Sequence, residues 1–226
     1  MTVKALDFNE QPKLKALLLQ GLAQLQLNYT EQQIQQWLSF LGELRKWNRV
    51  YNLTAITEPS AMVNQHLLDS LVIATYVQGT HCLDVGTGAG LPGIPLAILS
   101  PHQHWDLLDS QTKKIRFLTH VTHQLALANV KLIHERVEHY QCQTGYEVIT
   151  ARAFSSLNEF INKTQHLLAP GGKWLVMKGQ LSGEECEQLS NDVKIVRVIP
   201  LEIPGMKATR HLVIVTKQQK QTSDHG

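Results

Sequence analysis

A glycine-rich loop follows a short apolar stretch in the middle of the chain, and it is the segment best suited to bind a ligand. Residues 81–86 have the pattern of a strand, residues 86–90 alternate glycine with small residues, and residues 93–99 have the pattern of a helix. Glycines let the backbone approach a ligand closely, and the first N–H groups of a helix bind anionic groups. This order predicts a cofactor site at the carboxyl end of a parallel strand.

Two acids flank this loop. Asp84 immediately precedes the first glycine, where it can orient the loop or meet a cationic ligand, and Asp109 ends the next apolar stretch. An acid at the end of the second strand is placed to accept hydrogen bonds from ribose hydroxyls. We therefore predict a nucleoside-bearing cofactor, with Asp84, Gly88 and Asp109 among its contacts. The loop alone does not say which cofactor, because residues 88–93 also match the dinucleotide pattern G-x-G-x-x-G.

Strand and helix patterns alternate from residue 81 onward. Alternation of this kind predicts a parallel sheet with helices on both faces. The last two strands are joined by residues 200–210, which contain prolines and no helical pattern, so we expect them to be antiparallel. The predicted strands are 81–86, 105–109, 131–135, 146–151, 173–178, 194–199 and 211–217, and the helices between them are 93–99, 112–128, 157–168 and 183–190.

These patterns predict an α/β, Rossmann-like fold with a mostly parallel seven-stranded sheet and an antiparallel last strand. The acid before the first glycine and the antiparallel strand favour the sheet of a class I methyltransferase. An NAD-dependent oxidoreductase is the alternative that the loop leaves open. Residues 12–50 and 61–76 are helical in pattern, so we divide the chain into a helical extension (1–76), a cofactor-binding domain (77–217) and a disordered tail (218–226).

Composition excludes several classes of protein. The 226 residues carry a net charge of only +2 and are 43% hydrophobic, which indicates one globular domain with an extension. The three cysteines (Cys82, Cys142 and Cys186) lack metal-ligand spacing, so we expect reduced thiols and no metal. The amino terminus lacks the pattern of a signal peptide, and no apolar run reaches the roughly 20 residues of a membrane span. We expect a cytoplasmic protein without a membrane partner.

A resemblance extends beyond the loop. The chain resembles the bacterial small-subunit rRNA guanine-N7 methyltransferase family, also called glucose-inhibited division protein B, over roughly residues 40 to 215. The first 40 residues share only their helical pattern. The matching segments occur in the same order: 47–48, 51–54, 66–70, 84–95, 107–110, 114–118, 136–138, 152–154, 178–179 and 210–212.

The resemblance implies an activity, a cofactor and a partner. Members of that family methylate N7 of one guanine, guanine 527, in the decoding-region loop of 16S rRNA and use S-adenosylmethionine. It implies 16S rRNA or a small-subunit particle as partner, and we expect the chain to act as a monomer. A non-catalytic RNA-binding assembly factor is a further alternative. The residues carried over as cofactor contacts are Gly86, Leu91, Val137, Glu138 and Arg152.

Three polar side chains are candidates for positioning the substrate: Arg152, Lys178 and His66. Arg152 and Lys178 end predicted strands, and His66 shares a helix with Asp69 at a spacing of three residues. Many amino-methylating enzymes have an Asn/Asp-Pro-Pro-aromatic motif where this chain has Arg152. Guanine N7 has an exposed lone pair and no proton, so no residue is required as an acid or base. Arg152 can serve the cofactor carboxylate or the RNA equally well.

Two short basic stretches are candidates for contacts to RNA. In the first, an aromatic residue stands among the cations, and the second lies at the start of a predicted helix. Cationic side chains bind phosphate groups, although such runs are often only solvated surface. The candidate RNA-binding residues are Arg45, Lys46, Arg49, Lys113, Lys114 and Arg116.

Overall fold

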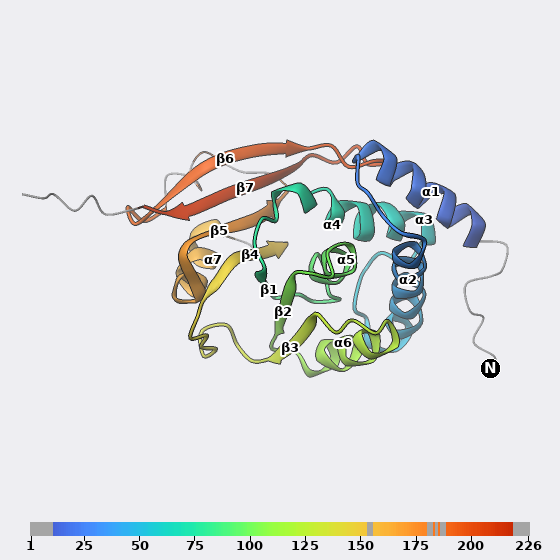
Figure 1. Ribbon diagram of the computed structural model, residues 1–226, viewed down its shortest axis with the longest axis horizontal. Helices are drawn as coiled ribbons and strands as arrows, with labels where there is room; N and C mark the ends of the chain where they lie inside the picture. The colour runs from blue at the N-terminus through green and yellow to red at the C-terminus, as the bar shows by residue number, and fades with distance from the viewer. Residues whose placement is uncertain (1–10, 153–155, 180–182, 184, 186–188, 219–226) are drawn as a thin grey trace, which may run out of the picture.

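The computed structural model describes residues 11–152, 156–179, 183, 185 and 189–218. Its centre is a seven-stranded sheet in the order β3-β2-β1-β4-β5-β7-β6 (Figure 1). The strands are β1 (His81–Val85), β2 (His104–Asp109), β3 (Val130–His134), β4 (Tyr146–Arg152), β5 (Leu168–Lys178), β6 (Val193–Leu201) and β7 (Arg210–Lys217).

Strand direction follows the prediction from the sequence. β1 to β5 are parallel, β7 runs antiparallel to β5, and β6 pairs only with β7. All seven predicted strands are therefore confirmed, together with the antiparallel final pair. Since the first five strands are parallel, their carboxyl ends lie at one edge of the sheet, where ligands of this architecture bind.

Neighbouring residues along each strand face two separate hydrophobic cores. In β1, Cys82 packs with the first core, whereas Leu83 and Val85 pack with the second. The first core includes α1 (Gln11–Gln24), α2 (Glu31–Tyr51), α5 (Gly93–Leu99) and α6 (Thr112–Gln124). The second core is covered by α7 (Leu157–Thr164), which lies beside β4 and β5 (Figure 1). The inner parallel strands β1, β2 and β4 are largely buried on both faces, as parallel strands require, whereas the edge strands β3 and β6 are more exposed.

The amino-terminal helices belong to the first core. A capping box of Thr30 and Gln33 starts α2, and Trp37 lies fully buried in that helix. The Nε1 of Trp37 donates a hydrogen bond to the carbonyl of Pro95 in α5, at 3.1 Å. The apolar stripe of this helix, Ile34, Trp37, Leu38, Leu41 and Leu44, is therefore packed core.

Three predicted elements differ in detail. The helix predicted over 61–76 is divided into α3 (Pro59–Met62), the π-helical segment η1 (Val63–Leu68), α4 (Asp69–Leu71) and the 3₁₀ turn η2 (Ala74–Tyr76). α6 ends at Gln124 rather than at residue 128, because Ala126 adopts a left-handed conformation with φ of 52°. β5 begins at Leu168 rather than at residue 173, and residues 170–172 lie inside the strand, where its register with β4 is irregular.

Two predictions fall mainly on residues that the structure does not describe. Of the helix predicted over 183–190, only residues 183, 185, 189 and 190 are described, and Cys186 is outside the described residues. Of the tail predicted over 218–226, only Gln218 is described. The helix and the tail stay predictions.

Candidate functional site

Asp84 fixes the shape of the glycine loop from inside the protein. Its carboxylate is fully buried and accepts hydrogen bonds from the hydroxyl of Thr87 at 2.7 Å, the backbone N–H of Gly93 at 3.0 Å and the hydroxyl of Thr150 at 3.2 Å. Burial raises the pKa of Asp84 to about 6, against the opposing effect of these hydrogen bonds. Of the two roles that we considered for Asp84, the structure shows the orienting one.

The first helical residue after the loop must be glycine. A Cβ on Gly93 would lie 2.3 Å from Cδ2 of Leu107 and 2.9 Å from Oδ2 of Asp84. The glycines at 86, 88 and 90 all have positive φ, a conformation that other residues adopt at a cost. Glycines at these positions therefore allow β1, the loop and the start of α5 to pack closely against one another.

Asp109 connects the second strand to the glycine loop. Its Oδ2 accepts a hydrogen bond from the N–H of Gly88 at 2.9 Å, and its Oδ1 accepts one from the N–H of Gln111 at 2.9 Å. Nζ of Lys114 lies 3.8 Å from the same carboxylate. A carboxylate has about four lone-pair sites, so these bonds leave acceptor capacity for a ribose hydroxyl.

A cavity of about 370 Å³ opens at the carboxyl ends of β1, β2 and β3. Its wall includes four of the predicted cofactor residues: Gly86, Asp109, Val137 and Glu138. Asp84, Gly88 and Leu91 do not line it, and the side chain of Leu91 is buried in the first core.

The cavity has the groups that a nucleoside needs. Leu108 and Val137 supply apolar surface, Asp109 supplies an acceptor for hydroxyls, and Gly86 exposes its backbone. Nζ of Lys163 lies 3.1 Å from the carboxylate of Glu138. A backbone hydrogen bond lowers the pKa of Glu138 most, and the contact with Lys163 lowers it further. This set of donors and acceptors fits the adenosine part of S-adenosylmethionine.

A second cavity, of about 290 Å³, lies beside the ends of β4, β5 and β7. Arg152 and Lys178, two of the predicted positioning residues, line it together with Arg210 and Asp69. Nη1 of Arg152 donates hydrogen bonds to the carbonyl of Gln65 and to Oδ2 of Asp69, both at 2.9 Å. The end of β4 therefore carries a cation that is held by the π-helical segment η1 and by the first residue of α4.

His66 is not on the wall of that cavity. Its ring is buried, and Nε2 lies 3.1 Å from the hydroxyl of Thr54. Burial, with a smaller contribution from Arg152, lowers the pKa of His66 to about 4, so the ring is neutral near neutral pH. The structure places this predicted positioning residue behind Arg152 rather than at the surface of the site.

Sequence reasoning missed Arg210, Lys163 and Glu185 as parts of the site. Arg210 is 3.4 Å from Oδ1 of Asp69, and Glu185 pairs with Lys178. Only Arg210 had a signal, since it begins one of the matching segments. The partners of Lys163 and Lys178 depend on how distant elements meet, which spacing along the chain does not reveal.

The two basic stretches meet in space. Trp47 of α2 lies against Phe117 and His120 of α6, with ring centroids 5.8 Å and 5.2 Å apart. Nζ of Lys113 donates a hydrogen bond to the carbonyl of Tyr51 at the end of α2, at 3.1 Å. These contacts bring the two helices that carry the basic stretches together, although Lys46, Lys113 and Lys114 also serve contacts within the protein.

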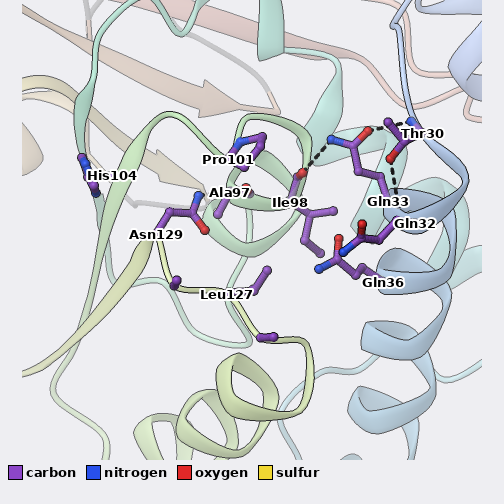
Figure 2. A pocket seen from close by; sticks show the side chains of 12 residues that line it. Thr30, Gln32, Gln33, Gln36, Ala97, Ile98, Pro101, His104, Leu127 and Asn129 are labelled. Carbon is purple, nitrogen blue, oxygen red and sulfur yellow. Dashed lines mark hydrogen bonds between the residues drawn. The ribbon is translucent and has the colours of Figure 1, made fainter.

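A third cavity, of about 510 Å³, lies elsewhere, between the start of α2 and the amino end of β2 (Figure 2). Its wall is rich in side-chain amides, and Gln33 donates hydrogen bonds to the carbonyls of Ile98 and Leu99, each at 2.9 Å. Gln33 therefore joins the end of α5 to the start of α2. None of the predicted cofactor or RNA residues lines this cavity.

The described part of the chain contains no candidate for a membrane-spanning helix or for a metal site. No helix there is long and apolar enough to cross a membrane. No group of three or more histidine, cysteine or acidic side chains there has an arrangement that could hold a metal ion.

Comparison with known proteins decides the family. The family model of GidB, rRNA small subunit methyltransferase G, matches residues 33–213. The chain belongs to this family. A ribosomal RNA small subunit methyltransferase G of Photobacterium profundum is 43% identical over 206 residues, which are 91% of this chain and 100% of that protein. The corresponding protein of Hydrogenovibrio crunogenus is 47% identical over 183 residues, 81% of this chain and 85% of its own.

Solved structures of lower identity support the fold of this GidB-family chain. A SAM-dependent methyltransferase from Aquifex aeolicus superposes with a TM-score of 0.52 at 16% identity, covering 75% of this chain and 96% of its own. The glycopeptide N-methyltransferase MtfA complexed with S-adenosylmethionine gives a TM-score of 0.57 at 11% identity, covering 68% and 95%. The GidB-family chain is an S-adenosylmethionine-dependent methyltransferase, and the expected family, fold class and cofactor are confirmed.

Family membership settles one alternative and leaves the residue assignments as predictions. It decides against the NAD-dependent oxidoreductase that the overlapping glycine pattern allowed. The division into a helical extension and a cofactor-binding domain also stays a prediction, and the helices of residues 11–76 share a hydrophobic cluster with the sheet.

Proposed function

We propose that this chain transfers the methyl group of S-adenosylmethionine to N7 of guanine 527, in the decoding-region loop of 16S rRNA. The names of its relatives specify RNA of the small ribosomal subunit. The observation that carries the choice of a ring nitrogen is the guanidinium of Arg152 at the end of β4. An exocyclic amine needs its proton removed at this position, and a guanidinium, which keeps its protons in proteins, is not a base.

The chain's own residues then have to orient groups rather than move protons. When bound, the cofactor supplies a methyl group that its sulfonium has already activated. Positioning alone can contribute about 7–11 kcal/mol to such a reaction. Gly86, Asp109 and Glu138 hold the nucleoside in the 370 Å³ cavity. Leu91 and Gly88 shape the loop behind them, and Lys178 and Arg152 face the substrate in the second cavity.

The RNA is held by the surface where α2 meets α6. Exposed cations on both helices, Arg49 and Arg116 among them, are placed to contact phosphates. N7 faces the deep, narrow groove of an RNA helix, where side chains read poorly, so the target base reacts unstacked. The substrate is 16S rRNA or a small-subunit particle, and one copy of the chain suffices.

The experiment that tests this function maps modified bases in rRNA. A bacterial strain lacking its own guanine-527 methyltransferase receives the gene for this chain, and primer extension after chemical cleavage reads N7-methylguanine. Restored modification at guanine 527 supports the proposal, and modification at another base contradicts it. RNA binding without methyl transfer, measured with labelled cofactor on both naked RNA and isolated subunits, would instead indicate the assembly factor.

The RNA surface has its own test. Log affinity falls with log salt by about 0.7 for each phosphate contact in single-stranded RNA. We expect Arg49→Gln and Arg116→Gln each to reduce the slope by about this amount. Lys194→Gln, an exposed cation on the opposite edge strand β6, is the matched control and leaves the slope unchanged. If the slope of log affinity against log salt is the same for all three variants, the α2–α6 surface does not contact the phosphates of the RNA.

A further inference from the structure

Asp69 is a buried carboxylate shared by two arginines. Only 1% of the residue is exposed, and its two oxygens face different guanidiniums. Oδ2 accepts the hydrogen bond from Nη1 of Arg152 at 2.9 Å, and Oδ1 lies 3.4 Å from Nε of Arg210. Oδ1 accepts no hydrogen bond of good geometry from any described residue. One negative charge thus stands between two positive side chains.

The two arginines depend on Asp69 to different degrees. Arg152 has a second anchor, since the same Nη1 donates to the carbonyl of Gln65 in the π-helical segment η1. Arg210 has a weaker one, a 3.4 Å hydrogen bond from Nη1 to the neighbouring carbonyl of Thr209. Within the described residues, Asp69 is therefore the main group that fixes the direction of Arg210.

The free edges of both guanidiniums are at the second cavity. The side chains of Arg152 and Arg210 are 23% and 33% exposed, and both line this cavity. Nη1 of Arg210 lies 3.5 Å from the place that a Cβ would take on Gly179, at the end of β5. A guanidinium has five N–H donors, so the hydrogen bond of Arg152 and the ion pair of Arg210 with Asp69 leave donors that can meet a further acceptor.

We propose that Asp69 is a positioning residue, which orients Arg210, and with it Arg152, toward a phosphate of the RNA strand that carries the target guanine. The inference rests on the proposed function. Planar guanidiniums bind phosphate in a fixed fork geometry, so their direction matters as well as their charge. Asp69 itself is too buried to touch the RNA and acts through the two arginines.

The decisive test is whether loss of the Asp69 charge weakens or strengthens RNA binding. Asp69→Asn preserves the side-chain volume and removes one negative charge, and lost negative charge ordinarily strengthens binding to a polyanion. The proposal demands the opposite: the Kd for a 16S rRNA fragment rises about tenfold, the value expected when one charge-assisted hydrogen bond is lost. Filter binding at fixed salt gives the Kd.

Asp106→Asn is the matched control. Asp106 is also a buried carboxylate, 6% exposed and bonded to the hydroxyl of Tyr146 at 2.5 Å, but it lies on β2 away from both arginines. Asp106→Asn removes the same negative charge, and we expect the Kd of this variant for the RNA fragment to stay within about twofold of that of the parent chain or to fall. If both variants bind RNA equally well, the proposal is wrong.

A double-mutant cycle separates positioning from general damage. Asp69→Asn in the Arg210→Gln background should weaken RNA binding less than about threefold, because Arg210, which depends most on Asp69, is already gone and Arg152 keeps its second anchor at Gln65. Additive losses overturn the proposal. The affinity for S-adenosylhomocysteine should stay within about threefold of the parent chain, and a larger fall would assign the arginines to the cofactor carboxylate instead and overturn the role in RNA binding.

One further variant covers the case in which Asp69→Asn does not fold. Arg210→Lys keeps the positive charge, but an ammonium group lacks the planar fork of donors that can contact Asp69 and a phosphate at the same time. The Kd for RNA should therefore again rise about tenfold. Binding like that of the parent chain overturns the proposal. Both measurements read RNA binding and not methyl transfer. If the parent chain binds RNA but modifies no guanine, the proposed function fails while the role of Asp69 is still decided.

Discussion

The two cavities at the carboxyl edge of the sheet are both organised by buried carboxylates, but in different ways. Asp84 and Asp109 in the glycine-loop region accept hydrogen bonds from backbone N–H groups and hydroxyls. Asp69 beside the second cavity meets two guanidinium groups. The first region is held by the backbone, and the second is held by side chains of opposite charge.

The two cavities therefore differ in what holds their walls in place: the backbone in the first, and paired charges in the second. Backbone N–H groups carry no net charge and are held by the fold, so the cofactor cavity is formed before the cofactor binds. The arginine cavity depends on the balance between Asp69 and its cations, which a polyanion can change. We infer that the first region is suited to one fixed ligand and the second to a charged strand.

The largest effect should come from adding a carboxylate to the glycine loop. Gly86 lines the cofactor cavity with φ of 65°, a conformation that aspartate tolerates better than most residues. Gly86→Asp should lower the affinity for S-adenosylhomocysteine at least about 100-fold, since its side chain fills space meant for the ligand. Calorimetry measures the affinity.

The control for this variant is Gly171→Asp. Gly171 also has a positive φ, of 75°, but a Cβ there would meet no atom within 4 Å. It should retain the affinity of the parent chain. Undiminished binding by Gly86→Asp would mean that the backbone-held region is not the cofactor site.

The next effect concerns the stability of the arginine region. Asp69→Asn leaves Arg152 and Arg210 without their shared counter-charge, and breaking a fully buried ion pair costs about 3–5 kcal/mol. Because both arginines are partly exposed, we expect a loss of about 2 kcal/mol in the free energy of unfolding, measured in urea. In the Arg210→Gln background the loss should be smaller, and an equal loss would show that no charge is shared between the two residues.

A third effect is the pH dependence of the backbone-held region. The pKa of Asp84 is raised from 3.8 to about 6 in the folded protein, so its contribution to stability is greatest below pH 3.8 and is lost as the pH rises through 6. Between about pH 5 and 7.5 the parent chain should lose about 1.4 kcal/mol relative to Asp84→Asn. Urea unfolding of both proteins at the two pH values measures this difference, and a constant difference would contradict the raised pKa.

The sequence predicted the glycine-loop region but not the contacts of the arginine region. The glycine loop, Asp84 and Asp109 lie within 26 residues of one another along the chain, from 84 to 109, and local patterns were enough to place them. Asp69 and Arg152 are separated by 83 residues, and Arg210 is farther still. No periodicity reports such a contact. The π-helical segment was missed too, because its residues have the spacing of an ordinary helix.

The smallest effect tests a charge at the rim of the backbone-held cavity. Lys163 bridges Glu138 at 3.1 Å and Glu159 at 2.7 Å, and all three side chains are partly exposed. Exposed ion pairs contribute little, so Lys163→Gln should lower the affinity for S-adenosylhomocysteine only about two- to threefold, by releasing Glu138. Glu159→Gln removes the other partner of Lys163 and should leave the affinity unchanged. A loss as large as that of Gly86→Asp would show that side-chain charge, and not the backbone alone, builds the cofactor cavity.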